Sequence, residues 1–184
     1  MTYPYQGGSN QTLFDSPADW VSPIAGRPDE AYIDNPSPAY RRKVIVNDAD
    51  PLGGHTLGDR PWVWKSFCRS LNVLFMETLD PSPTWQDSAR QTMGQECVLF
   101  TRLDLTSLMP HGELTSTPYC LARSGGEYLV FQPCDGSFTL DLSGASGQFT
   151  VLWSDGAVGD PMAGETITGG EVCNFTPPFK APLV

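Results

Sequence analysis

Three carboxylates follow two strand-like runs of this chain, and their spacing could support acid–base chemistry. The apolar run at 44–46 leads to Asp48 and Asp50, and the run at 72–76 leads to Glu77. If the two runs are neighbouring parallel strands, about 4.8 Å apart, their carboxyl ends bring Asp48 or Asp50 towards Glu77. Two carboxylates roughly 5 Å apart can divide the work of a general acid and a base or nucleophile between them. These three acids are therefore the candidate catalytic residues.

The same acids have a plainer explanation. Polar residues after a strand often cap the next helix or hydrate a loop. Side chains alternate along a strand, so Asp48 and Asp50 are expected on one side and Ala49 on the other. The sequence favours a shared orientation for the two aspartates but leaves their role open.

The segment between the two strands supplies three candidate substrate contacts. His55 lies in the loop after a Gly-Gly turn, and Trp62 and Trp64 lie in an aromatic-rich run that predicts a helix over 60–70. Two residues apart is about 200° around a helix, so one indole is expected in the core and the other near the strand ends or a domain interface. One histidine and two acids without fixed spacing do not make a metal site, so we expect no metal and no cofactor.

The order of the predicted elements indicates part of a β/α barrel. Strands are expected at 43–47 and 72–76, a helix lies between them, and another helix should run from Thr84 towards Leu105. A short helix is also expected to start at Ser16, with Pro17 in its first position. Strand, helix and strand with acids at the strand ends is the arrangement by which parallel barrels present working groups, and the chain holds about two such units.

From about residue 107 the pattern changes to short, partly alternating runs about ten residues apart with glycine-rich turns between them. This pattern is typical of an antiparallel β-sandwich. We therefore predict an α+β chain in two parts, with a barrel remnant in residues 1–105 and a sandwich in residues 106–184. The strand runs are expected at 118–122, 127–131, 137–142, 148–153, 166–168 and 172–175.

Composition excludes several classes of partner. The formal net charge of −10 over 184 residues argues against binding to a nucleic-acid backbone. No apolar run approaches the roughly 20 residues that span a bilayer, and the first residues lack the basic and apolar regions of a signal peptide.

The five cysteines are dispersed without a C-x-x-C motif, so free buried thiols are expected. Open strand edges predict self-association.

Six stretches carry a resemblance that covers nearly the whole chain: YQGGSN at 5–10, SPADW at 16–20, GDRPWVWKSF at 58–67, YCLA at 119–122, EYLV at 127–130 and FTPPF at 175–179. In these stretches the sequence resembles the C-terminal part of apiosidase-like bacterial glycoside hydrolases. Those proteins pair a (β/α)₈ barrel with a C-terminal β-sandwich described as collagen-binding. The resemblance implies that residues 43–105 are the last two units of the barrel.

The resemblance also sets the functional expectation. It implies a nucleophile on the seventh barrel strand and an acid/base residue on an earlier strand that this chain does not include. We therefore expect a carbohydrate-active fragment without complete catalytic machinery, with a plant cell-wall-type glycan as its partner. A full-length relative would be secreted or periplasmic. Relatives carry a histidine directly after the second strand-end aspartate, where this chain has Pro51, so the surroundings of Asp50 differ from theirs.

Two other function classes stay open. The sandwich could be a non-catalytic module that binds a polysaccharide or a matrix protein, or it could only buttress the barrel. The front segment holds four aromatic residues that could stack on a sugar ring or anchor a loop, and we favour the role of loop anchors: Trp20, Tyr32, Tyr3 and Tyr5. A binding surface on the sandwich would need aromatic side chains on its outward face.

Overall fold

The computed structural model describes residues 10–23, 38, 42–48, 60–74, 87–155 and 161–180. The chain forms two compact units, Met1–Arg90 (unit 1) and Gln91–Val184 (unit 2). Over the described residues it is a mixed α/β structure with small sheets and more strands than helices.

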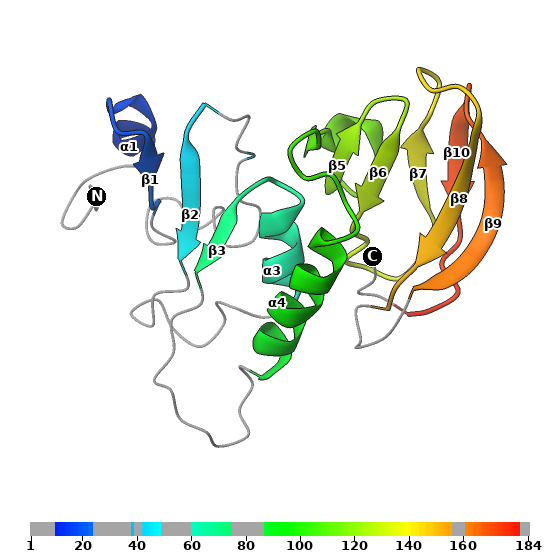
Figure 1. Cartoon of the computed structure of the whole chain (residues 1–184), viewed down its shortest axis with the longest axis horizontal. Helices are drawn as coiled ribbons and strands as arrows, with labels where there is room; N and C mark the ends of the chain where they lie inside the picture. The colour runs from blue at the N-terminus through cyan, green and yellow to red at the C-terminus, as the bar shows by residue number, and fades with distance from the viewer. Residues whose placement is uncertain are drawn as a thin grey trace. The chain divides into compact units, whose positions relative to one another are not determined.

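Unit 1 contains a parallel three-stranded sheet in the order β1-β2-β3. The described residues of this unit include helices α1 and α3, and the three strands lie side by side in Figure 1. The sequence-predicted order of strand, helix and strand is confirmed, because β2, α3 and β3 follow one another and β2 pairs in parallel with β3. The bounds are α1 Asn10–Asp15, β1 Trp20–Val21, β2 Val44–Asp48, α3 Arg60–Phe67 and β3 Asn72–Leu74.

The register of this sheet gives it two distinct faces. The pairs Val21–Ile45 and Asn47–Val73 point to one side, which we call the covered face. Its residues from β1 and β2 are all buried. The opposite side, which we call the open face, carries Trp20, Val44, Val46, Asp48, Asn72 and Leu74.

An apolar cluster and one buried hydrogen bond stabilise the covered face of the sheet. Val21 and Ile45 join Leu13 and Leu71 in one apolar cluster. The side chain of Asn47 donates a hydrogen bond of 2.6 Å from Nδ2 to Ser66 Oγ in α3, and both residues are buried. A buried amide needs such a partner, so this bond ties α3 to β2.

The expected helix start at Ser16 is wrong, because Ser16 lies just after α1 and closes it. Its backbone N–H and its hydroxyl both donate to the carbonyl oxygen of Leu13. Pro17 then disfavours a helical conformation at the residue before it. The Lys43 ammonium donates to the carbonyl oxygens of Ser16 and Ala18, at 2.5 and 2.7 Å, and so ties the loop before β1 to the start of β2.

Helix α3 ends in a left-handed residue. Ser70 has a φ of 58°, and its N–H donates to the carbonyl of Phe67 while the N–H of Leu71 donates to that of Ser66. These two bonds form a Schellman motif, in which glycine is the usual residue at the position that Ser70 occupies. The motif turns the chain directly into β3.

The second expected helix is found as α4, Asp87–Phe100. It begins three residues after Thr84, continues through Gly94 without a break and ends before Leu105. The helix crosses the division between the units at Arg90 and Gln91. The domain boundary near residue 106 stays a prediction.

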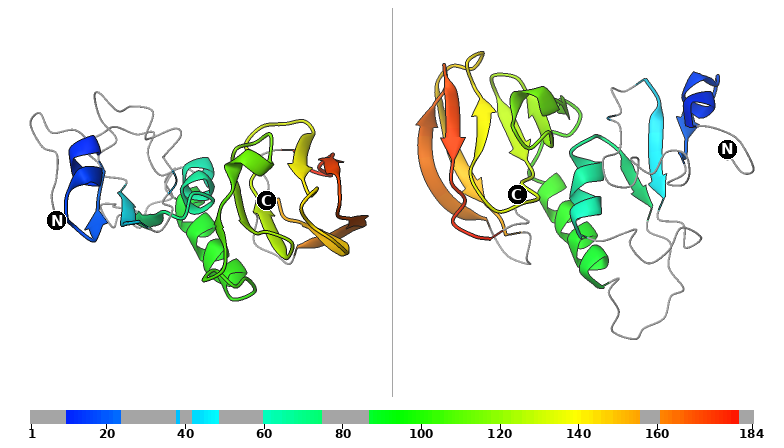
Figure 2. Two further views of the ribbon diagram at one scale, coloured as in Figure 1. Left: turned by 90° about the horizontal axis from the view of Figure 1, so that it is seen from above. Right: turned by 180° about the vertical axis from the view of Figure 1, so that it is seen from behind.

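Five strands of unit 2, β5 to β8 and β10, fall on runs that the sequence predicted. Strand β9 begins four residues before its predicted run, and β4 was not predicted. All the pairings among these strands are antiparallel. The sheets have the orders β4-β5-β6, β10-β7 and β8-β9. Figure 2 shows these strands from two further sides. The bounds are β4 Met109–Pro110, η2 Gly112–Leu114, β5 Cys120–Arg123, β6 Glu127–Val130, β7 Phe138–Asp141, β8 Gln148–Trp153, β9 Met162–Thr168 and β10 Val172–Phe175.

One core serves all the strands from β5 to β10. An aromatic group lies at its centre, in which the rings of Phe138 and Phe175 stack with centroids 5.3 Å apart and Trp153 meets both edge-on. Gly164 on β9 lies against this group, since a Cβ atom there would come within 2.6 Å of Trp153 Nε1. The cluster contains Cys120, Ala122, Phe138, Leu140, Leu142, Ala145, Trp153 and Phe175, and side chains from β6, β8 and β9 pack against it.

Candidate functional site

Asp48 ends β2 at the carboxyl edge of the parallel sheet. Its Cα partner is Leu74, the last residue of β3, and both lie on the open face. The residue is half-buried and its Oδ1 atom is buried. Ser66 of helix α3 accepts its hydrogen bond from Asn47 on the covered face. The Asp48 side chain lies on the opposite face of the sheet.

The neighbouring parallel strands that the acid pair requires are confirmed. Glu77 comes three residues after Leu74, so it follows the strand that pairs with β2. Asp50, His55 and Glu77 themselves lie outside the described residues. Their approach to Asp48 and their catalytic or substrate-binding roles stay predictions.

Trp62 and Trp64 are both buried in α3, with exposed fractions of 3% and 2%. Both can be buried although they point in opposite directions, because the helix is enclosed on most sides and Val63, Ser66 and Phe67 are buried as well. The Trp64 ring meets Phe67 edge-on at a centroid distance of 6.1 Å. In this arrangement both indoles are part of the hydrophobic core, and their role as substrate contacts stays a prediction.

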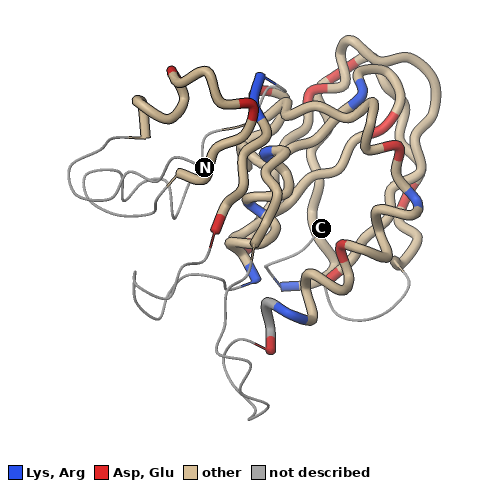
Figure 3. The backbone as a smooth tube through the Cα atoms, turned by 60° about the vertical axis from the view of Figure 1, so that its left-hand side comes forward, with Lys and Arg blue, Asp and Glu red and all other residues tan. Residues whose placement is uncertain are grey.

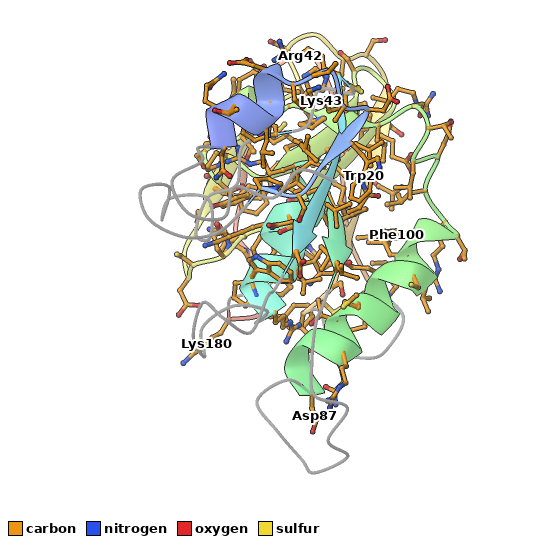
Figure 4. All side chains as sticks on the ribbon, turned by 90° about the vertical axis from the view of Figure 1, so that its left-hand side faces the viewer. Trp20, Arg42, Lys43, Asp87, Phe100 and Lys180 are labelled. Carbon is orange, nitrogen blue, oxygen red and sulfur yellow. The ribbon has the colours of Figure 1, made fainter. Side chains whose placement is uncertain are left out.

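Trp20 is the aromatic residue whose position the sequence did not predict. It lies on β1 rather than in a loop, opposite Val44, and 40% of it is exposed (Figure 4). The residue that anchors this strand is instead Val21, which is fully buried. Alternation along β1 therefore turns the indole onto the open face, which it shares with Asp48.

Two other ionisable groups in the described residues, Cys120 and Glu96, are unsuited to nucleophilic chemistry because they are buried. Burial raises the pKa of the Cys120 thiol to about 12, so it is not a ready thiolate. Burial also raises the pKa of Glu96, on α4, to about 9. His111 Nδ1 lies 2.7 Å from Glu113 Oε1, and this hydrogen bond lowers the pKa of the Glu113 carboxyl.

Within the described ranges, no group of three or more His, Cys, Asp or Glu side chains is placed to hold a metal ion. In the same part of the chain, no helix is both long enough and apolar enough to cross a membrane. Figure 3 shows acidic and basic residues spread along the described backbone.

The fold defined by these strands and helices is one found in glycoside hydrolases. A solved glycoside hydrolase of family 5 from Bacteroides vulgatus aligns with 92% of this chain at a TM-score of 0.64 and 14% identity. A second solved structure, described as a glycoside hydrolase, aligns with 75% of the chain at a TM-score of 0.56 and 12% identity. No family model and no curated protein matches the sequence.

The matched proteins are much longer than this chain. The alignments cover 50% of the family 5 hydrolase and 40% of the second protein. The chain therefore spans about half the length of these glycoside hydrolases or less, and the likeness is one of fold.

Proposed function

We propose that this chain is a carbohydrate-active protein of glycoside-hydrolase lineage that binds a plant cell-wall-type glycan and lacks a complete set of catalytic groups. The observation that carries the proposal is the position of Asp48. A carboxylate stands at the carboxyl end of a parallel strand, followed by a helix and a second parallel strand, in a chain with a glycoside-hydrolase fold. In barrels of this kind the working groups stand at that end of the strands.

In this proposal the sheet β1-β2-β3 is part of a β/α barrel and the strands of unit 2 form a β-sandwich. Parallel sheets are normally covered on both faces. The exposure of Val44 and Leu74, 52% and 44%, fits a face that a complete barrel would enclose. The six sequence stretches that resemble apiosidase-like hydrolases support the narrower assignment to that group, with unit 2 as the counterpart of its C-terminal domain.

The lack of independent turnover follows from which strands carry the acids. Hydrolysis of a glycosidic bond uses two carboxylates in separate roles. Asp48, Asp50 and Glu77 follow adjacent strands, whereas the resemblance implies an acid/base residue from an earlier strand. Hydrolysis would then lack its acid/base residue. The chain would bind a glycan without cleaving it.

For unit 2, the aromatic positions favour a buttress over a separate binding module. The rings of Phe138, Trp153 and Phe175 fill the core, and Tyr128 meets Phe149 edge-on beside it. A glycan platform needs exposed rings. We propose that these strands support the barrel part rather than bind a polysaccharide or collagen.

A binding and turnover assay on the whole chain tests this function. Xylo-, cello- and arabino-oligosaccharides are titrated by calorimetry, and reducing ends are measured after long incubation. We expect binding without turnover, and Asp48→Asn should weaken binding because it removes a charged hydrogen-bond acceptor. Asp19→Asn, at the amino end of the sheet, is the matched control and should bind as the wild type does.

Two results would contradict the proposal. Turnover that disappears in Asp50→Asn or Glu77→Gln would show a complete catalytic site in this chain. Absence of binding to every glycan, by the whole chain and by residues 106–184 on insoluble polysaccharide and collagen, would leave a purely structural role.

A further inference from the structure

Strand β9 forms one edge of the β8-β9 sheet in unit 2. Among the described strands it pairs with β8, and it lies at the rim of this unit in Figures 1 and 2. With seven residues it is the longest strand described, and its sequence MAGETIT contains neither proline nor lysine, which commonly guard an exposed edge. A bulge opposite Val151 leaves Thr166–Thr168 as the regular end of this strand.

The hydrogen bonds of the hairpin show which backbone groups of β9 face outward. The N–H of Gly169 donates to the carbonyl oxygen of Gly147 at 2.9 Å, and these two residues continue the β8–β9 register. Hydrogen-bonded and non-hydrogen-bonded pairs alternate along an antiparallel ladder, so Ile167 bonds to β8 whereas Thr166 and Thr168 do not. The N–H and C=O groups of both threonines therefore point away from β8.

These outward groups are self-complementary. A two-fold axis at Ile167 places Thr166 of each copy opposite Thr168 of the other, and the four residues then form about four backbone hydrogen bonds. The side chains of both threonines are exposed, and threonines pair favourably across strands. Ile167 packs against the core of its own unit, and in this register it meets its counterpart on the inner face of the joined sheet.

Charge and size set the strength of such a pairing. In this register Glu165 lies opposite Gly169, and the two Glu165 backbones are about 14 Å apart, beyond the Debye length of about 8 Å at physiological salt. Each copy carries a net charge of −10, so the copies repel one another at low salt. An edge of seven residues, about 24 Å long and about 10 Å thick, offers far less than the roughly 800 Å² that each partner of a stable complex buries.

We propose that the chain forms a weak two-fold dimer, in which β9 pairs antiparallel with β9 of a second copy and joins two β8–β9 hairpins into one four-stranded sheet. Both copies use the same edge, so the pairing closes at two copies. The inference is independent of the proposed carbohydrate function, because it uses none of the strand-end acids. The strands of unit 2 share one core, and the ladder of this unit alone defines the outward hydrogen-bonding groups.

Analytical ultracentrifugation of the whole chain tests the association. Between about 10 µM and 1 mM the weight-average mass should rise from 20.1 kDa towards twice that value, and the rise should be steeper at higher salt. A mass that stays at 20.1 kDa over this range would overturn the proposal.

Amide exchange followed by NMR identifies the edge without a variant. The N–H groups of Thr166 and Thr168 should exchange rapidly in the monomer and slow by at least about tenfold as the dimer forms. The N–H of Ile167 bonds to β8 and should be protected at every concentration. Unchanged exchange at both threonines in a sample that dimerises would place the contact elsewhere and overturn the proposal.

Thr168→Pro and Thr168→Ala form a matched pair of variants. Proline removes an N–H that the hairpin does not use, so the fold is kept while the outward donor is lost. Thr168→Pro should weaken dimerisation at least about tenfold, whereas Thr168→Ala keeps the N–H and should dimerise nearly as the wild type does. Equal dimerisation of the two variants, with circular dichroism showing both folded, would refute pairing through β9.

Discussion

Replacement of Glu96 by glutamine should stabilise the protein, by an amount that grows with pH. Glu96 lies on α4 with an exposed fraction of 5%, and its Oε1 has no hydrogen-bond partner among the described residues. Burial raises the pKa of this carboxyl from 4.5 to about 9. The group is therefore protonated in the folded protein at neutral pH, although it would be ionised in the unfolded chain.

The sign and size follow from proton linkage. Between pH 4.5 and 9 the folded state binds a proton that the unfolded state has released, so raising the pH lowers the free energy of unfolding. Each unit of pKa difference is worth about 1.36 kcal/mol. At pH 7 the raised pKa of Glu96 lowers the free energy of unfolding by at most about 3 kcal/mol. Between pH 5.5 and 8.5 this decrease grows by at most about 4 kcal/mol. Water entering around the ionised carboxylate would reduce both values.

Urea denaturation of wild type and Glu96→Gln at pH 5.5, 7.0 and 8.5, followed by circular dichroism, measures this effect. Glutamine keeps the shape and cannot ionise, although its amide must also be accommodated, so we expect a gain of about 1–3 kcal/mol at pH 7. The depressed pKa values of Asp104, Glu113 and Asp141 affect stability only at lower pH, because those groups are ionised in both states above pH 5.5.

Glu165→Gln, the same change at an exposed position of β9, is the control and should give a difference that does not vary with pH. A difference between Glu96→Gln and wild type that is equal at pH 5.5 and 8.5 would refute the reasoning. So would a wild type that gains stability relative to the variant as the pH rises.

Three further changes test the packing of the elements. Ser70→Gly should raise the free energy of unfolding, measured by urea denaturation, by about 0.5–1 kcal/mol, because glycine adopts the positive φ at the end of α3 without a Cβ penalty. Gly164→Ala should destabilise by about 1–3 kcal/mol in the same assay, because its Cβ would come within 2.6 Å of Trp153 Nε1. Asn47→Ala should cost about 1–3 kcal/mol, because the buried hydroxyl of Ser66 loses its 2.6 Å partner.

Each of these has its own control. Ser70→Val should lower stability, since a branched side chain is strained at positive φ. Gly144→Ala should change little, because among the described residues nothing beyond its two chain neighbours lies within 4 Å of the added Cβ. A double variant of Asn47 and Ser66 to alanine should cost less than the sum of the two single changes, and full additivity would argue against the bond.

Much of the strand pattern could be predicted from the sequence, because alternation and glycine-rich turns are local signals. The positions of β2 and β5 to β8 follow from them, and so does the orientation of Asp48 relative to Asn47. The strand at Trp20 could not be predicted, because a strand of two residues has no periodicity. Its place depends on pairing with Val44 and on the long-range bonds of Lys43.

Burial on helices was the harder part to predict. Trp62 and Trp64 point in opposite directions, yet both are buried, because the surroundings of α3 and not its own pattern decide exposure. Glu96 has no sequence signal that marks it as buried, since the exposed Cys97 and Val98 follow it directly. A charged residue type in the interior is a feature that tertiary packing alone reveals.

The shared core of unit 2 has a consequence for how its strands open. Side chains from every strand between β5 and β10 meet in one cluster, although the sheets themselves have only two or three strands. An isolated hairpin such as β8–β9 is only marginally stable in water. The backbone amides of β8 and β9 should therefore exchange with deuterium through the same cooperative unfolding event as those of β5 and β7.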